Sequence, residues 1–197
     1  MNEEHSKYEW LNLDEFVEKI DWDDNKEILS DMLKHKNSGK ILDLGCGEGG
    51  FSLSLADKGF DVTCVDISKK AISEIKKEAR KRKLKINVVC FDLENYKIKE
   101  DYDIILALGI LQFLGEDGRR YLEKIQRHTK KGGINIINSF INRWLLKGKL
   151  KEMYYEWDIK DYEEYEQKLL QGGKKWMNYL FAIKRDLGFK KLKKIVG

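Results

Sequence analysis

The segment at residues 41–50, with the sequence ILDLGCGEGG, constrains the fold more than any other part of the chain. A short apolar run, typical of a buried β-strand, leads into four glycines within six residues. Glycine permits a tight turn, and it lets the backbone approach a ligand closely because it has no Cβ. Apolar residues resume directly after the glycines. The segment therefore predicts a strand, a glycine turn and a helix, with a ligand at the turn.

Strand-like and helical segments alternate along the chain up to residue 140. Strands are predicted at residues 41–44, 60–65, 86–91, 102–108 and 134–138. Helices are predicted at residues 51–56, 68–83 and 118–129, with a turn at 130–133. Two further helical segments, 14–20 and 26–36, precede the first strand. Strict alternation predicts a parallel sheet with right-handed crossovers.

The pattern changes after residue 140. A helix is predicted at 147–155, and two long strand-like segments, 158–170 and 174–185, flank Gly172 and Gly173. A Gly-Gly pair supplies the positive φ angles that a β-hairpin turn needs. We therefore predict an α/β fold with a Rossmann-like sheet of seven mostly parallel strands and a C-terminal antiparallel hairpin. A dinucleotide-binding Rossmann sheet, by contrast, has parallel strands only.

Composition and charge narrow the function classes. The chain has no proline, three cysteines and a net charge of +4. Without proline, it lacks the Asn/Asp-Pro-Pro-aromatic signature of enzymes that methylate amino groups of nucleic acids. The longest apolar run, 104–111, is far shorter than the roughly 18 residues that a membrane helix needs. The odd cysteine count favours reduced thiols and a cytoplasmic location. We expect a small-molecule substrate rather than DNA, RNA or a membrane, despite a basic run at 190–194.

Three aspartates follow or end consecutive predicted strands. Asp43 lies in the first strand, Asp66 ends the second, and Asp92 follows the third. The carboxyl ends of parallel strands meet at one edge of the sheet, where open α/β sheets bind their ligands. Asp66 also follows Gly45 by the roughly 20 residues expected of a carboxylate that accepts hydrogen bonds from ribose hydroxyls.

The glycine pattern by itself leaves more than one ligand open. Gly45-x-Gly47-x-x-Gly50 matches the dinucleotide fingerprint, so NAD is an alternative, as is a glycine turn without a ligand. Asp43 disfavours a pyrophosphate and suits the cationic methionyl end of S-adenosylmethionine (SAM). Asp92 has no role in the NAD pattern, but it would accept a hydrogen bond from an adenine amino group. Together with the hairpin, these features favour SAM as the cofactor.

These motifs resemble those of class I SAM-dependent methyltransferases over residues 40–185. Residues 41–49 resemble the first motif of that family, 65–68 the second, 91–93 the third and 108–114 the fourth. The resemblance implies that the glycines contact the methionyl group, Asp66 the ribose, and Asp92 the adenine. The predicted cofactor-binding residues are Asp43, Gly45, Cys46, Gly47, Gly49, Asp66, Ile67, Asp92, Leu93, Leu108, Gly109 and Gln112.

A narrower resemblance involves residues 50–62, 111–114 and 148–157, which look like the tellurite-resistance methyltransferase family. That family transfers methyl groups to tellurium or selenium oxyanions, so the resemblance implies a chalcogen oxyanion or a thiol as the acceptor. The closing hairpin of that family carries histidine and arginine residues. Here no histidine follows His128, and the hairpin offers Gln167, Lys168, Lys174 and Lys175 instead.

The acceptor pocket is predicted where aromatic segments interrupt the strand–helix rhythm, and its candidate residues are Trp10, Gln112, Phe113, Trp144 and Tyr154. We predict an N-terminal helical cap at residues 1–39 and a methyltransferase domain at 40–197. No side chain is assigned as catalytic, because displacement at a sulfonium needs a base only for a protonated nucleophile. Cys46, Cys64 and Cys90 match no zinc pattern and are interpreted as buried packing residues. An RNA- or protein-modifying methyltransferase and a non-catalytic SAM-binding protein remain alternatives.

Overall fold

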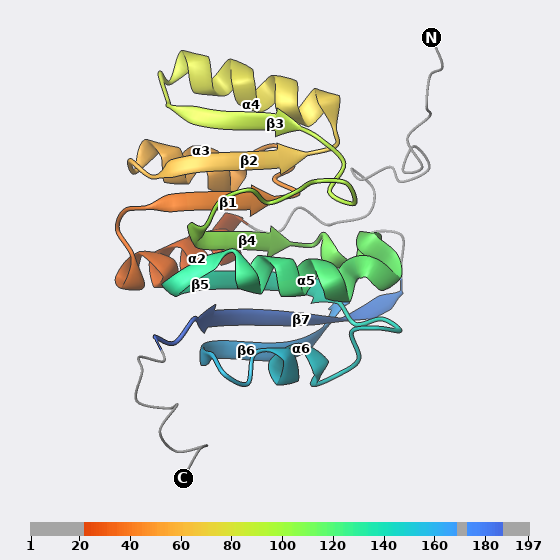
Figure 1. Ribbon diagram of the computed structural model, residues 1–197. Coiled ribbons are helices and arrows are strands. Elements are labelled where there is room, and N and C mark those ends of the chain that lie inside the picture. The colour runs from red at the N-terminus through yellow and green to blue at the C-terminus, as the bar shows by residue number, and fades with distance from the viewer. Residues whose placement is uncertain (1–21, 169–172, 187–197) are drawn as a thin grey trace.

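The computed structural model describes residues 22–168 and 173–186, which form one sheet covered by helices on both faces (Figure 1). The strands are β1 (Lys40–Leu44), β2 (Asp61–Asp66), β3 (Ile86–Cys90), β4 (Tyr102–Leu108), β5 (Thr129–Phe140), β6 (Asp158–Lys168) and β7 (Lys174–Ile183). The helices are α2 (Trp22–His35), α3 (Gly50–Asp57), α4 (Lys69–Lys81), the 3₁₀ segment η1 (Leu111–Asp117), α5 (Gly118–Arg127) and α6 (Lys149–Met153). The helix predicted at 14–20 lies outside the described residues.

The strand order is β3-β2-β1-β4-β5-β7-β6. The pairs β1–β2, β2–β3, β1–β4 and β4–β5 are parallel, whereas β7 runs antiparallel to both β5 and β6. The predicted seven-stranded sheet with its C-terminal antiparallel hairpin is therefore confirmed. The direction of strand addition reverses between β1 and β4, which is where open α/β sheets form a ligand crevice.

Two apolar layers hold the helices on the sheet. On one face, Met32 of α2 and Leu55 of α3 pack with Ile41, Ile104 and Phe181. On the other face, α5 and α6 cover a cluster that includes Leu122, Leu150, Ile105, Ile137 and Leu180. Figure 1 shows α5 and α6 in front of the sheet and α2 and α3 behind it. Strands β1 and β4 read as unbroken apolar runs because both of their faces are covered.

The turn predicted before the fifth strand is wrong. Residues 130–133 were expected to form a turn, but they lie within β5 as a bulge. Thr129 pairs with Tyr102, and the next pair joins Ile134 to Ile104, so β5 carries the extra residues. Gly132 has φ +68°, and its N–H donates to the carbonyl of Lys184 at 2.8 Å. The Lys184 N–H in turn donates to the carbonyl of Gly133, so the bulged backbone remains hydrogen-bonded.

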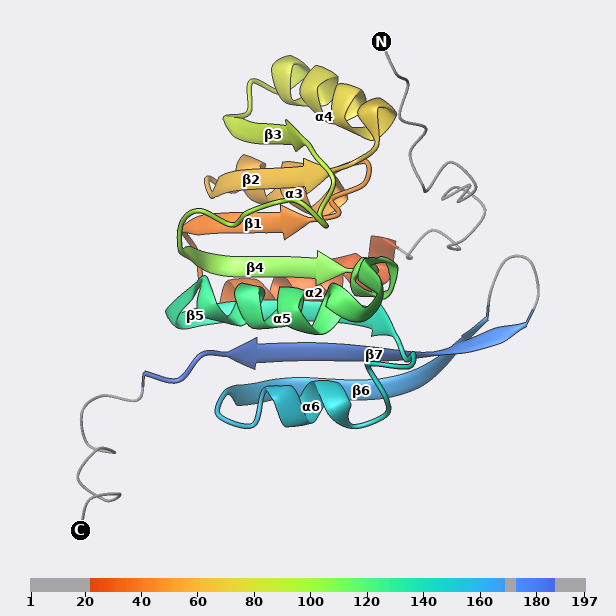
Figure 2. The ribbon, with the colours of Figure 1, turned by 45° about the vertical axis from the view of Figure 1, so that its right-hand side comes forward.

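The hairpin of β6 and β7 is longer than the strand on which it packs. The β5–β7 pairing ends at Phe140 and Met177, whereas β6 and β7 stay paired as far as Lys168 and Lys174. Figure 2 shows this end of the hairpin as an arm that projects past the tip of β5. In the described part of the chain, no helix is long and apolar enough to cross a membrane.

Candidate cofactor site

The glycine turn after β1 has the backbone geometry that its sequence predicts. Gly45, Gly47 and Gly49 have φ angles of +71°, +50° and +82°. The N–H groups of Gly45 and Cys46 both donate to the carbonyl of Val65, at 2.8 and 3.2 Å, and this attaches the turn to the end of β2. Positive φ angles disfavour side chains at all three glycines. At Gly45, in addition, a Cβ would lie 1.9 Å from Cγ2 of Ile110.

Asp66 lies directly against this turn. One carboxylate oxygen accepts a hydrogen bond from the Gly47 N–H at 2.8 Å, and the other accepts from the Ser68 N–H at 2.8 Å. The Ser68 hydroxyl caps α4 by accepting from the Ala71 N–H. Asp66 thereby joins the glycine turn to the start of the helix that follows β2. An ionised carboxylate has about four acceptor positions, so two remain for donors such as ribose hydroxyls.

Asp43 is buried beneath the turn, where its carboxylate accepts a hydrogen bond from the Ser52 hydroxyl of α3 at 2.6 Å. Burial raises the pKa of Asp43 to about 6; the Ser52 bond opposes this rise and the charge of Asp66 adds to it. Ser52 was missed in the sequence because it occupies one position in a mostly apolar helix. The sequence signal that could have identified it is a hydroxyl side chain nine residues after Asp43, because the glycine turn between them folds α3 back over the end of β1.

The stability of the protein is expected to depend on Asp43 ionisation. The folded-state pKa of about 6 lies above the unfolded value of 3.8. The stabilising contribution is therefore fully present below pH 3.8 and is lost as the pH rises through 6. Relative to Asp43→Asn, the wild type should lose about 1 kcal/mol of unfolding free energy between pH 5 and pH 7. Urea unfolding at both pH values checks this, and equal pH dependence in the two proteins would refute it.

The predicted adenine-side residues lie just after β2 and β3. Asp92 is half-buried, and its carboxylate accepts from the Glu94 N–H at 3.0 Å. Ile67 and Leu93 are also half-buried. Cys90 pairs in register with Asp66 and is exposed, with its thiol 3.7 Å from the carbonyl of Ile67. The expectation of three buried cysteines is therefore wrong for Cys90, because β3 is the edge strand.

Cys46 and Cys64 differ from Cys90 in their surroundings. Cys64 is buried and Cys46 is half-buried against the same apolar cluster. Proximity to Cys64 and burial raise the pKa of the Cys46 thiol well above its usual range. Cys46 is thus a protonated, packed side chain within the turn. Among the described residues, no group of three His, Cys, Asp or Glu side chains is placed to hold a metal ion.

The end of β4 brings the remaining predicted cofactor residues together. Gly109 has φ +70°, and its N–H donates to the carbonyl of Asn138 at 2.9 Å. The Gln112 amide N–H donates to the carbonyl of Gly109 at 2.6 Å, and its oxygen accepts from the Ser139 hydroxyl at 3.0 Å. Leu108 is half-buried beside them. Ser139 was missed because only the register of β4 and β5 brings it to Gln112.

The predicted acceptor-pocket residues do not form one wall. Phe113 is half-buried in η1, and Trp10 lies outside the described residues. Trp144 is half-buried and packs on the start of α5, where a Cβ on Gly118 would lie 2.3 Å from its ring. Tyr154 is fully buried, with its ring against Trp157 and its hydroxyl donating to the Asn135 side-chain oxygen at 2.9 Å. The assignment of Tyr154 to an open pocket is therefore corrected to the core.

Removing the hydroxyl of Tyr154 is expected to lower stability rather than cofactor binding. Tyr154→Phe leaves the buried oxygen of Asn135 without a donor, which should lower the unfolding free energy by about 1–2 kcal/mol. Tyr155, the next residue, is 75% exposed, so Tyr155→Phe serves as the control and should change stability by less than about 0.5 kcal/mol. Urea unfolding of both variants decides the matter, and equal effects would argue against the core assignment.

The residues at this edge of the sheet fit SAM. Asp66 supplies acceptors for ribose hydroxyls, Asp92 an acceptor for an amino group, and the buried Asp43 a negative charge for a cation. A Cβ on Gly47 would have no heavy atom within 4 Å, so the turn is open on this side. A glycine turn that points outward over carboxylates is a surface for a cationic ligand with hydroxyl groups.

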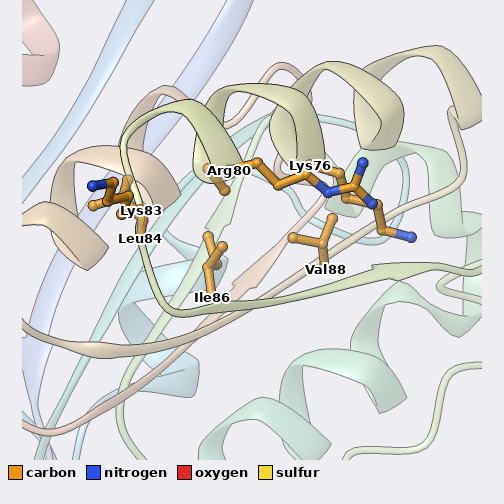
Figure 3. A pocket seen from close by; sticks show the side chains of 7 residues that line it. Lys76, Arg80, Lys83, Leu84, Ile86 and Val88 are labelled. Atoms are coloured by element: carbon orange, nitrogen blue, oxygen red, sulfur yellow. The ribbon is translucent and has the colours of Figure 1, made fainter.

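A groove lies between α4 and β3, away from the glycine turn (Figure 3). It has a volume of about 350 Å³ and is lined by Lys76, Ala79, Arg80, Lys83, Leu84, Ile86 and Val88. In the described part of the chain, Lys76, Arg80 and Lys83 form no ion pair. A groove with cations and an apolar floor suits anions rather than a sulfonium.

The sheet order, the switch point and the glycine turn define the class I SAM-dependent methyltransferase fold. The family model for "Tellurite resistance protein TehB" matches residues 12–175. The chain belongs to the TehB family. This confirms the narrower resemblance seen in the sequence.

Individual proteins agree with this family. A probable S-adenosyl-L-methionine-dependent methyltransferase TehB of Haemophilus influenzae is 31% identical over 137 residues, covering 64% of this chain and 48% of that protein. A ubiquinone biosynthesis O-methyltransferase of Rickettsia typhi is 35% identical over 104 residues, or 53% of this chain and 42% of the other. The chain spans about half the length of these relatives.

Solved structures support the same fold. The crystal structure of TehB from Haemophilus influenzae superimposes with a TM-score of 0.73 at 27% identity, covering 81% of this chain and 62% of the other. The N-methyltransferase NodS from Bradyrhizobium japonicum, solved with S-adenosylhomocysteine, gives a TM-score of 0.67 at 16% identity, with coverages of 83% and 86%. The second likeness concerns the fold alone. SAM, the cofactor predicted from the sequence, is the one named for the TehB relative.

Proposed function

We propose that this chain is a SAM-dependent methyltransferase that acts on a small-molecule acceptor. The observation that carries the proposal is the carboxylate of Asp66, which is held on the glycine turn by the Gly47 N–H with acceptor positions to spare. Asp43, buried below the same turn, adds negative charge at the place where a cationic ligand would lie. Family membership and the fold point to the same cofactor.

The residues divide the work of the site. Gly45, Cys46, Gly47 and Gly49 would hold the methionyl group, and Ile67, Asp92 and Leu93 the adenine. Leu108, Gly109 and Gln112 would border the reacting methyl group. When bound, SAM supplies a methyl group on a positively charged sulfur. The protein then has to align the acceptor with that group and exclude water, for which rigid, hydrogen-bonded residues such as Gln112 are suited.

Chalcogen oxyanions and thiols are the first acceptor candidates, as the family implies. A radiolabelled-methyl transfer screen over selenite, tellurite, thiols and small metabolites tests the proposal. Labelled product from any of them supports it. SAM binding without transfer to any acceptor would instead favour a non-catalytic SAM-binding protein, and no SAM binding would refute the proposal.

A methyltransferase that acts on RNA is the second candidate, and the cationic groove between α4 and β3 favours it. Residues 69–85 contain nine Lys or Arg and two Glu residues. Binding to a phosphate backbone would weaken steeply with salt, with a slope set by the number of phosphates contacted. RNA binding that changes little between 50 and 200 mM salt, or that survives charge reversal at Lys76, Arg80 and Lys83, would exclude this groove as an RNA site.

We also keep the domain division as a proposal, with a cap at residues 1–39 and the methyltransferase domain at 40–197. Helix α2 lies before this boundary and packs on the sheet through Met32, which is 1% exposed. The cap therefore includes a helix that shares the core of the main domain. A cytoplasmic location remains a prediction from the cysteine content.

A further inference from the structure

A row of polar residues crosses the sheet at the level where β4 ends. Ser139 of β5 pairs in register with Asn178 of β7, which pairs with Glu164 of β6. Side chains alternate between the faces of a strand, and Ile137 and Leu180, two residues away, belong to the cluster covered by α5 and α6. The polar row therefore lies on that face. Ser139 is 0% exposed and Asn178 is 1% exposed, among mostly apolar neighbours.

Hydrogen bonds connect this row to the mouth of the candidate cofactor site. The Ser139 hydroxyl donates to Gln112, and Gln112 donates to the carbonyl of Gly109. At the other end of the row, Glu164 accepts from the Gly148 N–H at 2.5 Å and from the Tyr162 hydroxyl. The row thus begins at the residue beside which the reacting methyl group is expected.

In this row of described residues, Asn178 has a buried side-chain oxygen that lacks a hydrogen-bond donor. A buried acceptor without a donor is costly, and such groups are retained where a ligand or a water satisfies them. The missing partner must be a hydrogen-bond donor, because a carboxamide oxygen only accepts.

We infer that Asn178 is a specificity-determining residue for the methyl acceptor and that it takes a hydrogen bond from the acceptor molecule. This inference rests on the proposed methyltransferase function. The acceptor would carry an O–H or N–H donor apart from the atom that is methylated. A hydroxyl-bearing thiol is an example, because it reacts as the thiolate after its sulfur has released its proton to solvent, and it keeps the hydroxyl as a donor. A fully ionised oxyanion fits the row poorly, because Asn178 presents an oxygen and Glu164 a carboxylate. The positive charge of Lys147 helps to lower the pKa of Glu164, but its ammonium lies over the ring of Trp176 and not in the polar row.

The test compares Asn178→Leu with Asn135→Leu, using 2-mercaptoethanol and selenite as probes and release of S-adenosylhomocysteine as the readout. The pH is kept above the last pKa of selenite, so that selenite has no O–H donor while 2-mercaptoethanol keeps its hydroxyl. Asn135 is also buried on the same face, but its side chain is fully bonded to Thr129, Tyr154 and the backbone. For Asn178→Leu we expect KM for 2-mercaptoethanol to rise at least about tenfold, with SAM affinity within about twofold of wild type. The melting temperature should rise by about 2–4 °C, because an unpaired buried oxygen is removed.

Asn135→Leu should show the opposite pattern, with a lower melting temperature and an unchanged KM for the folded enzyme. Asn178→Asp, which keeps an acceptor oxygen, should retain more thiol methylation than Asn178→Leu. An unchanged KM in Asn178→Leu would mean that the oxygen holds only a structural water, and would overturn the inference. Faster turnover of fully ionised selenite than of 2-mercaptoethanol by the wild type would overturn the acceptor class.

The two proposals fail in different ways. Wild-type protein that binds SAM but methylates neither probe rejects the inference and leaves the cofactor assignment intact. Wild-type protein that does not bind SAM rejects the proposed function itself.

Discussion

Replacing Gly45 with alanine is expected to lower the unfolding free energy by about 2–5 kcal/mol, enough to threaten folding in a chain of this size. Two costs add. The backbone at Gly45 has φ +71°, which strains any residue with a side chain. The new Cβ would also lie 1.9 Å from Cγ2 of Ile110, a buried residue packed in the core cluster under α5 and α6.

Gly47→Ala is the matched control, because it separates the two costs. Gly47 also has a positive φ, +50°, but no atom lies within 4 Å of the position of its Cβ. Only the backbone cost remains, about 1–2 kcal/mol. Urea unfolding of both variants gives the comparison. Equal losses would show that Ile110 does not pack beneath the turn in solution.

Asp66→Ala is expected to weaken SAM binding by about 1.5–3 kcal/mol, or roughly 10- to 150-fold in Kd. The substitution removes the proposed acceptor for the ribose hydroxyls. It also leaves the Gly47 and Ser68 N–H groups without the carboxylate that holds them at 2.8 Å. The turn would therefore have to be ordered by the ligand itself, at an entropic cost.

Isothermal calorimetry with SAM measures this effect. Asp61→Ala is the control, because Asp61 is exposed at the opposite end of the same strand and should leave affinity unchanged. If Asp66→Ala binds SAM as the wild type does, the ribose assignment is wrong, and with it the main support for the cofactor site.

Much of the fold was predictable because its signals are local. Each strand, helix or turn was predicted from a pattern within its own segment, such as an apolar run, helical periodicity or the glycines at 45–50. The alternation of strands and helices then predicts a parallel sheet. The wrong predictions concern segments whose structure depends on residues far away in the sequence. Residues 130–133 have the composition of a turn, but hydrogen bonds to residue 184, more than fifty positions away, keep them in the sheet.

The candidate site shows the same division. Asp43, Asp66 and the glycines were identified because they lie in one compact motif and one fixed spacing. Ser52, Ser139 and Asn178 were not, because helix packing and strand register decide what they face. Tyr154 was assigned to a pocket because aromatic residues near an interrupted pattern suggest a lid. It is buried in the core, where its hydroxyl bonds to Asn135, a residue that no local pattern connects to it.

The neighbourhood of Asp43 and Asp66 has a consequence for the order of events in a catalytic cycle. Burial and, to a smaller extent, the charge of Asp66 raise the pKa of Asp43, so above pH 6 Asp43 carries a buried negative charge that Asp66 repels. An incoming cation relieves that repulsion, whereas after methyl transfer the sulfur is neutral and the product has lost one positive charge. For the proposed reaction, the pocket would therefore hold the charged donor more tightly than the spent one. Methyl transfer would therefore weaken the electrostatic attraction between the site and its product, which favours exchange of the product for a new molecule of SAM.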